Sequence, residues 1–104
     1  MVRLALALAL LAAFPAAIAD PAPARRAELL HMVRQDCGSC HGLTLKGGLG
    51  PSLEPEALAA KDPEVLEFVI LNGRPGTPMP PWRPFVTDAE AQWIVRQLQQ
   101  GLAQ

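Results

Sequence analysis

Two cysteines and a histidine stand within five consecutive residues of this chain, in the order Cys37-Gly38-Ser39-Cys40-His41. In this spacing the two thiols can add across the vinyl groups of a porphyrin, and the adjacent histidine is placed to ligate the iron. The motif therefore predicts one covalently attached haem c, with Cys37 and Cys40 as thioethers and His41 as an axial ligand.

Three other uses of the cysteines remain open at this point. A disulfide between Cys37 and Cys40 is possible in an oxidising compartment, and a thioredoxin-like redox pair needs the same spacing. The redox pair expects a βαβ context, and the sequence has no alternating strand pattern. Structural zinc needs four ligands, and only His31 is near enough in sequence to join the three residues of the motif.

The second axial position of the iron needs a further donor, for which Met79, Met32 and His31 are the candidates. Met32 and His31 precede the motif on one expected helix, so neither could easily fold back over the opposite face of the haem. Met79 lies 38 residues after His41, between two prolines, in a stiff segment long enough to pass around the porphyrin. We therefore expect His41 and Met79 to be the metal ligands, with bis-histidine ligation through His31 as the alternative.

A histidine and methionine pair has two chemical consequences. The thioether favours ferrous iron and raises the reduction potential relative to two histidines. An iron saturated by protein ligands has no open position for oxygen, peroxide or nitrite, so we expect electron transfer and no enzymatic activity. A small haem peroxidase or a gas-binding protein, the competing class, would need Met79 to dissociate readily.

Helices and long loops must position these ligands. Caps and apolar spacing predict three helices, over residues 22–36, 62–71 and 87–101. Glycines and prolines predict irregular loops over residues 42–55 and 74–84.

The last predicted helix has its apolar side chains on one stripe, so we expect it to pack against the first. Trp93 on that helix is expected in the core between the two. Trp82 follows Met79 closely and is expected to lie against the haem or to shield its edge. His31 is expected to be a helix residue that is either exposed or hydrogen-bonded within the protein.

Residues 1–19 have the features of a cleaved signal peptide. Arg3 precedes the apolar run of residues 4–13, and Ala17 and Ala19 fit the cleavage pattern, which leaves Asp20 as the first mature residue. The sequence therefore predicts a periplasmic protein with one domain, residues 20–104. A retained membrane anchor is the alternative, but the apolar run falls short of the roughly 20 residues that span a bilayer.

The expected mature domain has 85 residues, with eight Lys and Arg against ten Asp and Glu, and so a formal charge of −2. It contains no basic cluster that could neutralise phosphates, which argues against nucleic acid as a partner. No segment after the leader is long and apolar enough to span a membrane. A domain of this size often needs a cofactor or another covalent link for stability, which agrees with a bound haem.

With the motif near the mature N-terminus and a methionine toward the C-terminus, the chain resembles the class I cytochromes c. This resemblance implies an all-α fold of about four short helices and long loops wrapped around one covalent haem. The segment Gly50-Pro51-Ser52-Leu53 is similar to that family's Gly-Pro-x-Leu segment. The similarity implies that the Pro51 carbonyl accepts a hydrogen bond from the second ring nitrogen of His41 and is part of the cofactor site.

A more specific resemblance covers residues 36–99 and is carried mainly by residues 36–53 and 73–85. These segments are similar to the NirC-type monohaem cytochromes associated with dissimilatory nitrite reductase in denitrifying bacteria. The resemblance implies a periplasmic carrier that passes electrons from an upstream donor to nitrite reductase in transient encounters, and we expect a monomer. A role as an accessory factor in the maturation of that enzyme is the alternative. Arg74 and Arg83 flank the methionine and could pair with haem propionates or an acidic partner, with solvated loop charges as the alternative.

Overall fold

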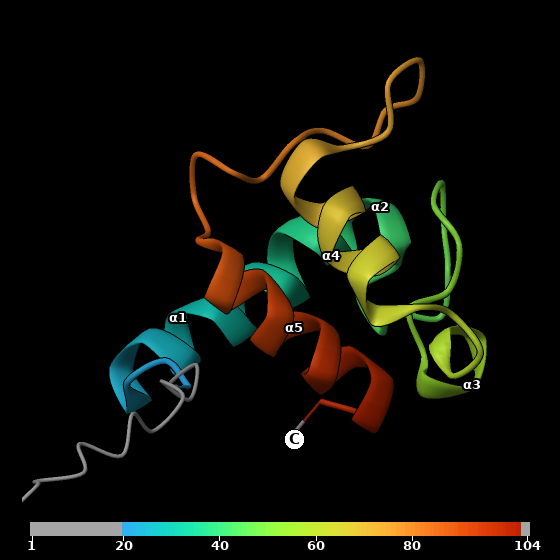
Figure 1. Ribbon diagram of the computed structural model, residues 1–104. Helices are drawn as coiled ribbons and strands as arrows, with labels where there is room; N and C mark the ends of the chain where they lie inside the picture. The colour runs from blue at the N-terminus through green and yellow to red at the C-terminus, as the bar shows by residue number, and fades with distance from the viewer. Residues whose placement is uncertain (1–19, 103–104) are drawn as a thin grey trace, which may run out of the picture.

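The computed structural model describes residues 20–102, which form helices joined by loops and contain no β-strand (Figure 1). The helices are α1 (Pro23–Met32), the π-helical segment η1 (Val33–Cys37), α2 (Gly38–His41), α3 (Pro55–Leu58), α4 (Pro63–Asn72) and α5 (Asp88–Gln100). This arrangement confirms the all-α prediction. Among residues 20–102, no helix is both long and apolar enough to cross a membrane. The predicted signal peptide, residues 1–19, lies outside the described residues.

Side-chain caps start α4 and α5 close to where the sequence places their ends. The carboxylate of Asp62 accepts the N–H of Glu64 at 2.9 Å and so opens α4. Thr87 and Glu90 form the expected capping box, with each side chain accepting the other's backbone N–H, at 3.1 Å and 2.9 Å. The sequence did not predict α3, a single turn that begins at Pro55.

The first helix is longer and less regular than the predicted span of residues 22–36. It continues through η1 into α2, so the Cys37–His41 motif is itself helical. Residues 33–37 adopt π-helical turns although they contain neither proline nor glycine. Such wider turns occur frequently at functional sites.

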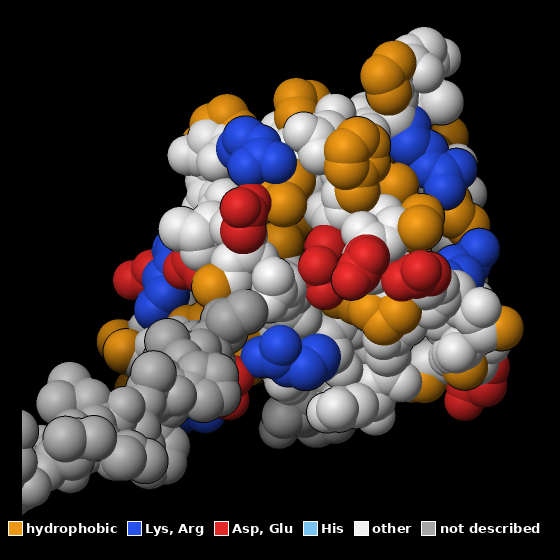
Figure 2. All heavy atoms as spheres, viewed as in Figure 1, with side chains coloured by type: hydrophobic (Ala, Val, Ile, Leu, Met, Phe, Trp, Pro, Cys, Tyr) orange, Lys and Arg blue, Asp and Glu red, His pale blue; other side chains and the backbone are white. Residues whose placement is uncertain are grey.

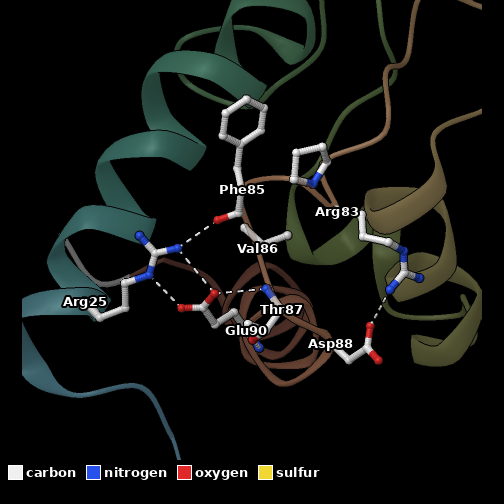
Figure 3. A pocket seen from close by; sticks show the side chains of 8 residues that line it. Arg25, Arg83, Phe85, Val86, Thr87, Asp88 and Glu90 are labelled. Atoms are coloured by element: carbon white, nitrogen blue, oxygen red, sulfur yellow. Dashed lines mark hydrogen bonds and ion pairs between the residues drawn. The ribbon is translucent and has the colours of Figure 1, made fainter.

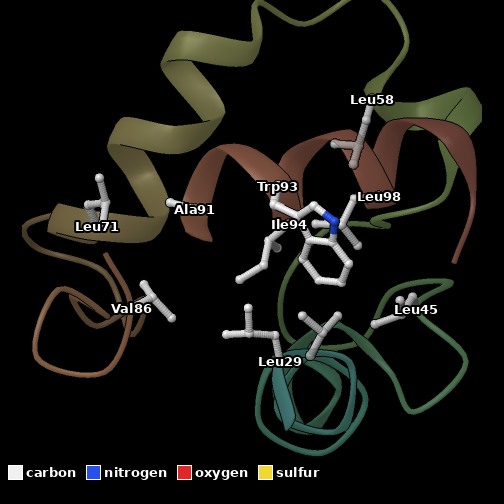
Figure 4. Packing of buried hydrophobic residues seen from close by; sticks show 10 residues of the cluster. Leu29, Leu45, Leu58, Leu71, Val86, Ala91, Trp93, Ile94 and Leu98 are labelled. Atoms are coloured by element: carbon white, nitrogen blue, oxygen red, sulfur yellow. The ribbon is translucent and has the colours of Figure 1, made fainter. Parts of the chain in front are cut away.

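Buried apolar side chains join α5 to the first helix and to α4 (Figure 4). Leu29 and Val33 of the first helix are 0% and 1% exposed and share one cluster with Trp93 and Ile94 of α5. Figure 4 shows Leu29 pointing toward the α5 side chains. The expected packing of the last helix on the first, with Trp93 in the core, is therefore confirmed.

Candidate haem-binding site

Cys37 and Cys40 lie three residues apart on a continuous helix and therefore project from the same side of it. Both are half-buried, and no disulfide joins them in residues 20–102. Burial, followed by the negative charge of Asp36, raises the pKa of the Cys37 thiol to about 11. A redox pair of the thioredoxin type attacks through a thiol of lowered pKa, so this environment does not support the redox alternative.

The loop after the motif folds back onto the end of α2. The N–H of Gly47 donates to the His41 carbonyl and the N–H of Gly50 donates to the Cys40 carbonyl, both at 2.8 Å. These bonds satisfy two carbonyls that the end of a helix would otherwise leave free. Gly42 begins the turn with a φ of 90°, which favours glycine, and a Cβ there would lie 2.6 Å from the Gly47 carbonyl.

This loop brings the Pro51 carbonyl oxygen to 2.7 Å from Nδ1 of His41. A carbonyl can only accept a hydrogen bond, so Nδ1 must carry the proton and donate. In the neutral ring, Nε2 is then unprotonated and has the lone pair that iron ligation requires. The contact thus fixes both the orientation of the His41 ring and its tautomer.

Gly50 supplies the space that the His41 ring occupies. A Cβ at Gly50 would lie 2.7 Å from Cε1 and 2.8 Å from Nδ1 of the ring, closer than real Cβ atoms approach. The glycine of the Gly50-Pro51 pair therefore has a steric role that sequence reasoning did not assign. The pair itself was the available signal, because a glycine beside a carbonyl acceptor allows close backbone approach.

Met79 stands on a different element, the strap of residues 73–87 that joins α4 to α5 (Figure 1). The N–H groups of Trp82 and Arg83 donate to carbonyls in the last turn of α4, at 2.9 Å and 3.2 Å. The N–H of Arg74 donates to the Met79 carbonyl at 3.2 Å. Met79 is half-buried. The structure therefore brings His41 and Pro51 together. Met79 lies instead on a strap that is hydrogen-bonded to the last turn of α4.

The far end of the strap is attached to α1 by a contact that sequence reasoning missed (Figure 3). The Arg25 guanidinium donates to both carboxylate oxygens of Glu90, at 2.6 Å and 3.3 Å, and to the Phe85 carbonyl at 2.8 Å. These hydrogen bonds from Arg25 hold the pKa of Glu90 below its usual value. The adjoining cavity of about 540 Å³ is lined by these residues and includes neither His41 nor Met79. The cavity therefore lies where the strap meets α1, apart from the proposed iron ligands.

The other candidate residues have less direct relations to the site. His31 is exposed on α1, as expected, and in residues 20–102 no group of three or more His, Cys, Asp or Glu side chains is placed to hold a metal ion. Trp82 packs against the core and lies 5.7 Å from the Phe85 ring, between centroids.

The donor set fits a covalently bound haem. Two thiols on one side of a helix, followed by an imidazole with Nε2 unprotonated, match thioether attachment and axial ligation. Met79, held between prolines, provides a soft sulfur donor on a separate segment.

Known proteins resemble this chain in sequence and structure over most of its length. A protein-family model described as cytochrome c oxidase, cbb3-type, subunit III matches residues 24–96. Cytochrome c55X of Paracoccus denitrificans is 56% identical over 94 residues, which cover 90% of each chain. The solved structure of the c-type cytochrome NirC is 52% identical, with a TM-score of 0.77 over 79% of this chain and 96% of that one.

A longer protein also contains a similar region. The structure of dihydro-haem d1 dehydrogenase NirN in complex with DHE is 39% identical, with a TM-score of 0.64 over 72% of this chain and 16% of that one. Family match, sequence identity and fold all agree, and the chain therefore belongs to the c-type cytochromes, a family whose cofactor is haem c, and within it to the cytochrome c55X group.

Proposed function

We propose that the mature protein, residues 20–104, is a periplasmic cytochrome with one haem, which carries single electrons to dissimilatory nitrite reductase and is not itself an enzyme. The observation that carries the proposal is the 2.7 Å hydrogen bond between His41 and Pro51, because it leaves Nε2 of His41 free for iron. The likeness to NirC and to cytochrome c55X supports a place in the nitrite reductase system.

In this proposal, Cys37 and Cys40 would hold the porphyrin through thioether bonds, and His41 and Met79 would ligate its iron. The bound haem supplies a reversible one-electron couple. The chain's own residues hold the imidazole in one orientation through Pro51 and keep the sixth position closed through Met79. Small ligands are thereby excluded, and only electrons can be exchanged.

We propose the strap as the docking surface. Phe85 is 63% exposed and Arg74 is exposed, whereas Arg83 is paired with Asp88 at 3.0 Å. Acidic side chains instead gather across α4 (Figure 2). There, burial and the neighbouring acids Glu64 and Asp62 raise the pKa of Glu67. An acidic enzyme surface would therefore favour the strap over the exposed face of α4.

The direct test mixes the pre-reduced holoprotein with purified oxidised nitrite reductase in a stopped-flow instrument. Reoxidation of the cytochrome coupled to reduction of the enzyme is expected, with a rate that rises with enzyme concentration. Mature protein alone should consume no nitrite. Absence of electron delivery at every ionic strength would refute the carrier role.

A second candidate is an accessory role in nitrite reductase maturation, and the likeness to part of dihydro-haem d1 dehydrogenase favours it. Dehydrogenation of a dihydro-haem releases two electrons and two protons, so two one-electron cytochromes could accept the electrons. The test supplies oxidised cytochrome to that dehydrogenase and its substrate, and follows cytochrome reduction. A strain that lacks this cytochrome and makes nitrite reductase with an incomplete set of haems would also favour this candidate.

A further inference from the structure

Gly73, the residue after α4, touches the backbone of the proposed iron ligand. Its φ of 68° and ψ of −171° lie in a region that essentially only glycine adopts. A Cβ at this position would lie 2.6 Å from the Met79 carbonyl oxygen, 2.8 Å from the carbonyl carbon of Pro80 and 2.9 Å from the nitrogen of Pro81. Real Cβ atoms essentially never come so close. All three neighbours are backbone atoms, so no side-chain rotation could relieve the collision.

The strap has little freedom to yield at this point. Three prolines, at positions 78, 80 and 81, fix φ on both sides of Met79. The N–H of Arg74 also holds the Met79 carbonyl, and the N–H of Trp82 holds the strap on Ile70. Displacement of the Met79 carbonyl would therefore be passed on to the Met79 side chain.

We propose that Gly73 is a positioning residue for the sixth iron ligand. Its close approach to Met79 sets how far the strap lies from the end of α4, and so where the Met79 sulfur meets the iron. Gly73 would thereby tune the strength of the sulfur bond and the reduction potential without touching the haem. This inference rests on the proposed ligation by Met79.

The test compares Gly73→Ala with Gly76→Ala in the holoprotein. Gly76 is a matched control, because it lies in the same strap with a φ of 79° and a Cβ there would meet nothing within 4 Å. In Gly73→Ala we expect loss of the weak far-red absorption of the ferric form that reports sulfur on iron, and a lowered reduction potential. Imidazole should bind on the order of tenfold more tightly, since the closed state is less populated. Gly76→Ala should keep the band and the wild-type imidazole affinity.

The possible outcomes distinguish a failure of this inference from a failure of the proposed ligation by Met79. An unchanged band and potential in Gly73→Ala, or equal losses in both glycine variants, would overturn the role of Gly73. Met79→Ala tests the ligation itself. A band that survives in Met79→Ala would remove the ligand assignment, and the positioning role with it.

A measurement on the wild-type holoprotein covers the case in which Gly73→Ala fails to fold. Imidazole that displaces Met79 should speed hydrogen exchange at the Arg74 amide, because that N–H donates to the Met79 carbonyl. The amides of Gly73 and Trp82 donate to α4 carbonyls and should stay protected. Unchanged exchange at Arg74 would mean that the sulfur moves independently of this contact, and the inference would fall.

Discussion

His41 ends a continuous helix that begins at Pro23, whereas Met79 lies in a strap without regular structure. The residues that fix His41 are close in sequence, since Gly50 and Pro51 come from the next loop. The groups that contact Met79 lie in the same strap, at Gly73 and Arg74. The strap itself is hydrogen-bonded to α4 through Trp82 and Arg83, and to α1 through Arg25. His41 is thus held directly at its ring, whereas Met79 is held through its backbone, in a strap that is attached to α4 and α1.

The site thus has a helical side, which carries the cysteines and His41, and a strap side, which carries Met79. We expect substitutions on the two sides to have different effects. Damage to the helical side should prevent formation of the holoprotein, because attachment and ligation share one short segment. Damage to the strap should leave the haem attached and alter its sixth ligand. The strap should also open locally at a lower free energy than the helix, since it has fewer internal hydrogen bonds.

Loss of His41 is expected to have the largest effect. His41→Ala removes the ligand that adjoins both attachment cysteines, and we expect little holoprotein with covalent haem. Haem staining of denaturing gels and the mass of the purified chain measure this. Met79→Ala is the comparison variant and should retain haem at the wild-type level. Equal retention in the two variants would contradict the division between the sides.

Replacement of Met79 is expected to change the reduction potential of the iron without loss of the haem. Met79→His should lower the reduction potential by on the order of 0.1 V, because imidazole does not favour ferrous iron as a thioether does. Redox titration measures the shift. Met32→Leu is the control, since Met32 belongs to α1 and packs toward the core. A loss of the far-red band in Met32→Leu would reassign the ligand.

Gly50→Ala should disturb the helical side less severely. The added methyl group would press on the His41 ring, so we expect a changed potential and a weakened Nδ1 hydrogen bond while Met79 remains bound. Nuclear magnetic resonance of the His41 ring and a redox titration would detect both effects. A ring environment identical to wild type would show that the loop moves to accommodate the added methyl group and that the ring does not.

The Arg25 to Glu90 pair should contribute stability to the far end of the strap, without a role in ligation. Glu90→Gln should cost about 1 kcal/mol, because Arg25 is still 37% exposed and solvent screens the pair. The pKa of Glu90 is lowered on folding, so the contribution is present above its usual value of 4.5 and is lost as the pH falls through the lower, folded value. Urea unfolding of the holoprotein at several pH values measures it.

The matched control for this pair is Arg96→Gln. Arg96 pairs with Asp20 at 2.8 Å, but both side chains are more exposed, at 44% and 61%, so we expect almost no loss. A stability difference in Glu90→Gln that does not shrink at low pH would contradict the electrostatic origin.

Charge reversal on the strap should have the smallest effect, a change in association rate of a few-fold. Arg74→Glu should slow electron delivery to nitrite reductase at low ionic strength, and added salt should shrink the difference. Arg83→Glu should also slow delivery, but salt should change its effect less, because Arg83 already shares its charge with Asp88. Stopped-flow rates at several salt concentrations measure both. Unchanged rates in the variant that carries both substitutions, Arg74→Glu and Arg83→Glu, would place the docking surface elsewhere.

Much of this protein is determined by its sequence alone. The motif at residues 37–41, the capping box at Thr87 and the Asp62 cap are local signals, because each depends on residues a few positions apart. They were enough to predict the cofactor class, the two long C-terminal helices and the buried face of α5. The contact of Pro51 with His41 was implied by the resemblance of residues 50–53 to the Gly-Pro-x-Leu segment of class I cytochromes c.

Only the tertiary structure decided the contacts between distant segments. The π-helical turns at residues 33–37 have no local signal, since the same residues would also suit an α-helix. The bonds from Arg25 to Glu90 and Phe85 exist because packing of the helices brings distant segments together. The close approach of Gly73 to Met79 depends on how the strap folds back on itself after α4. Sequence spacing fixes which groups neighbour one another along a helix, whereas distances across the core depend on how whole helices pack.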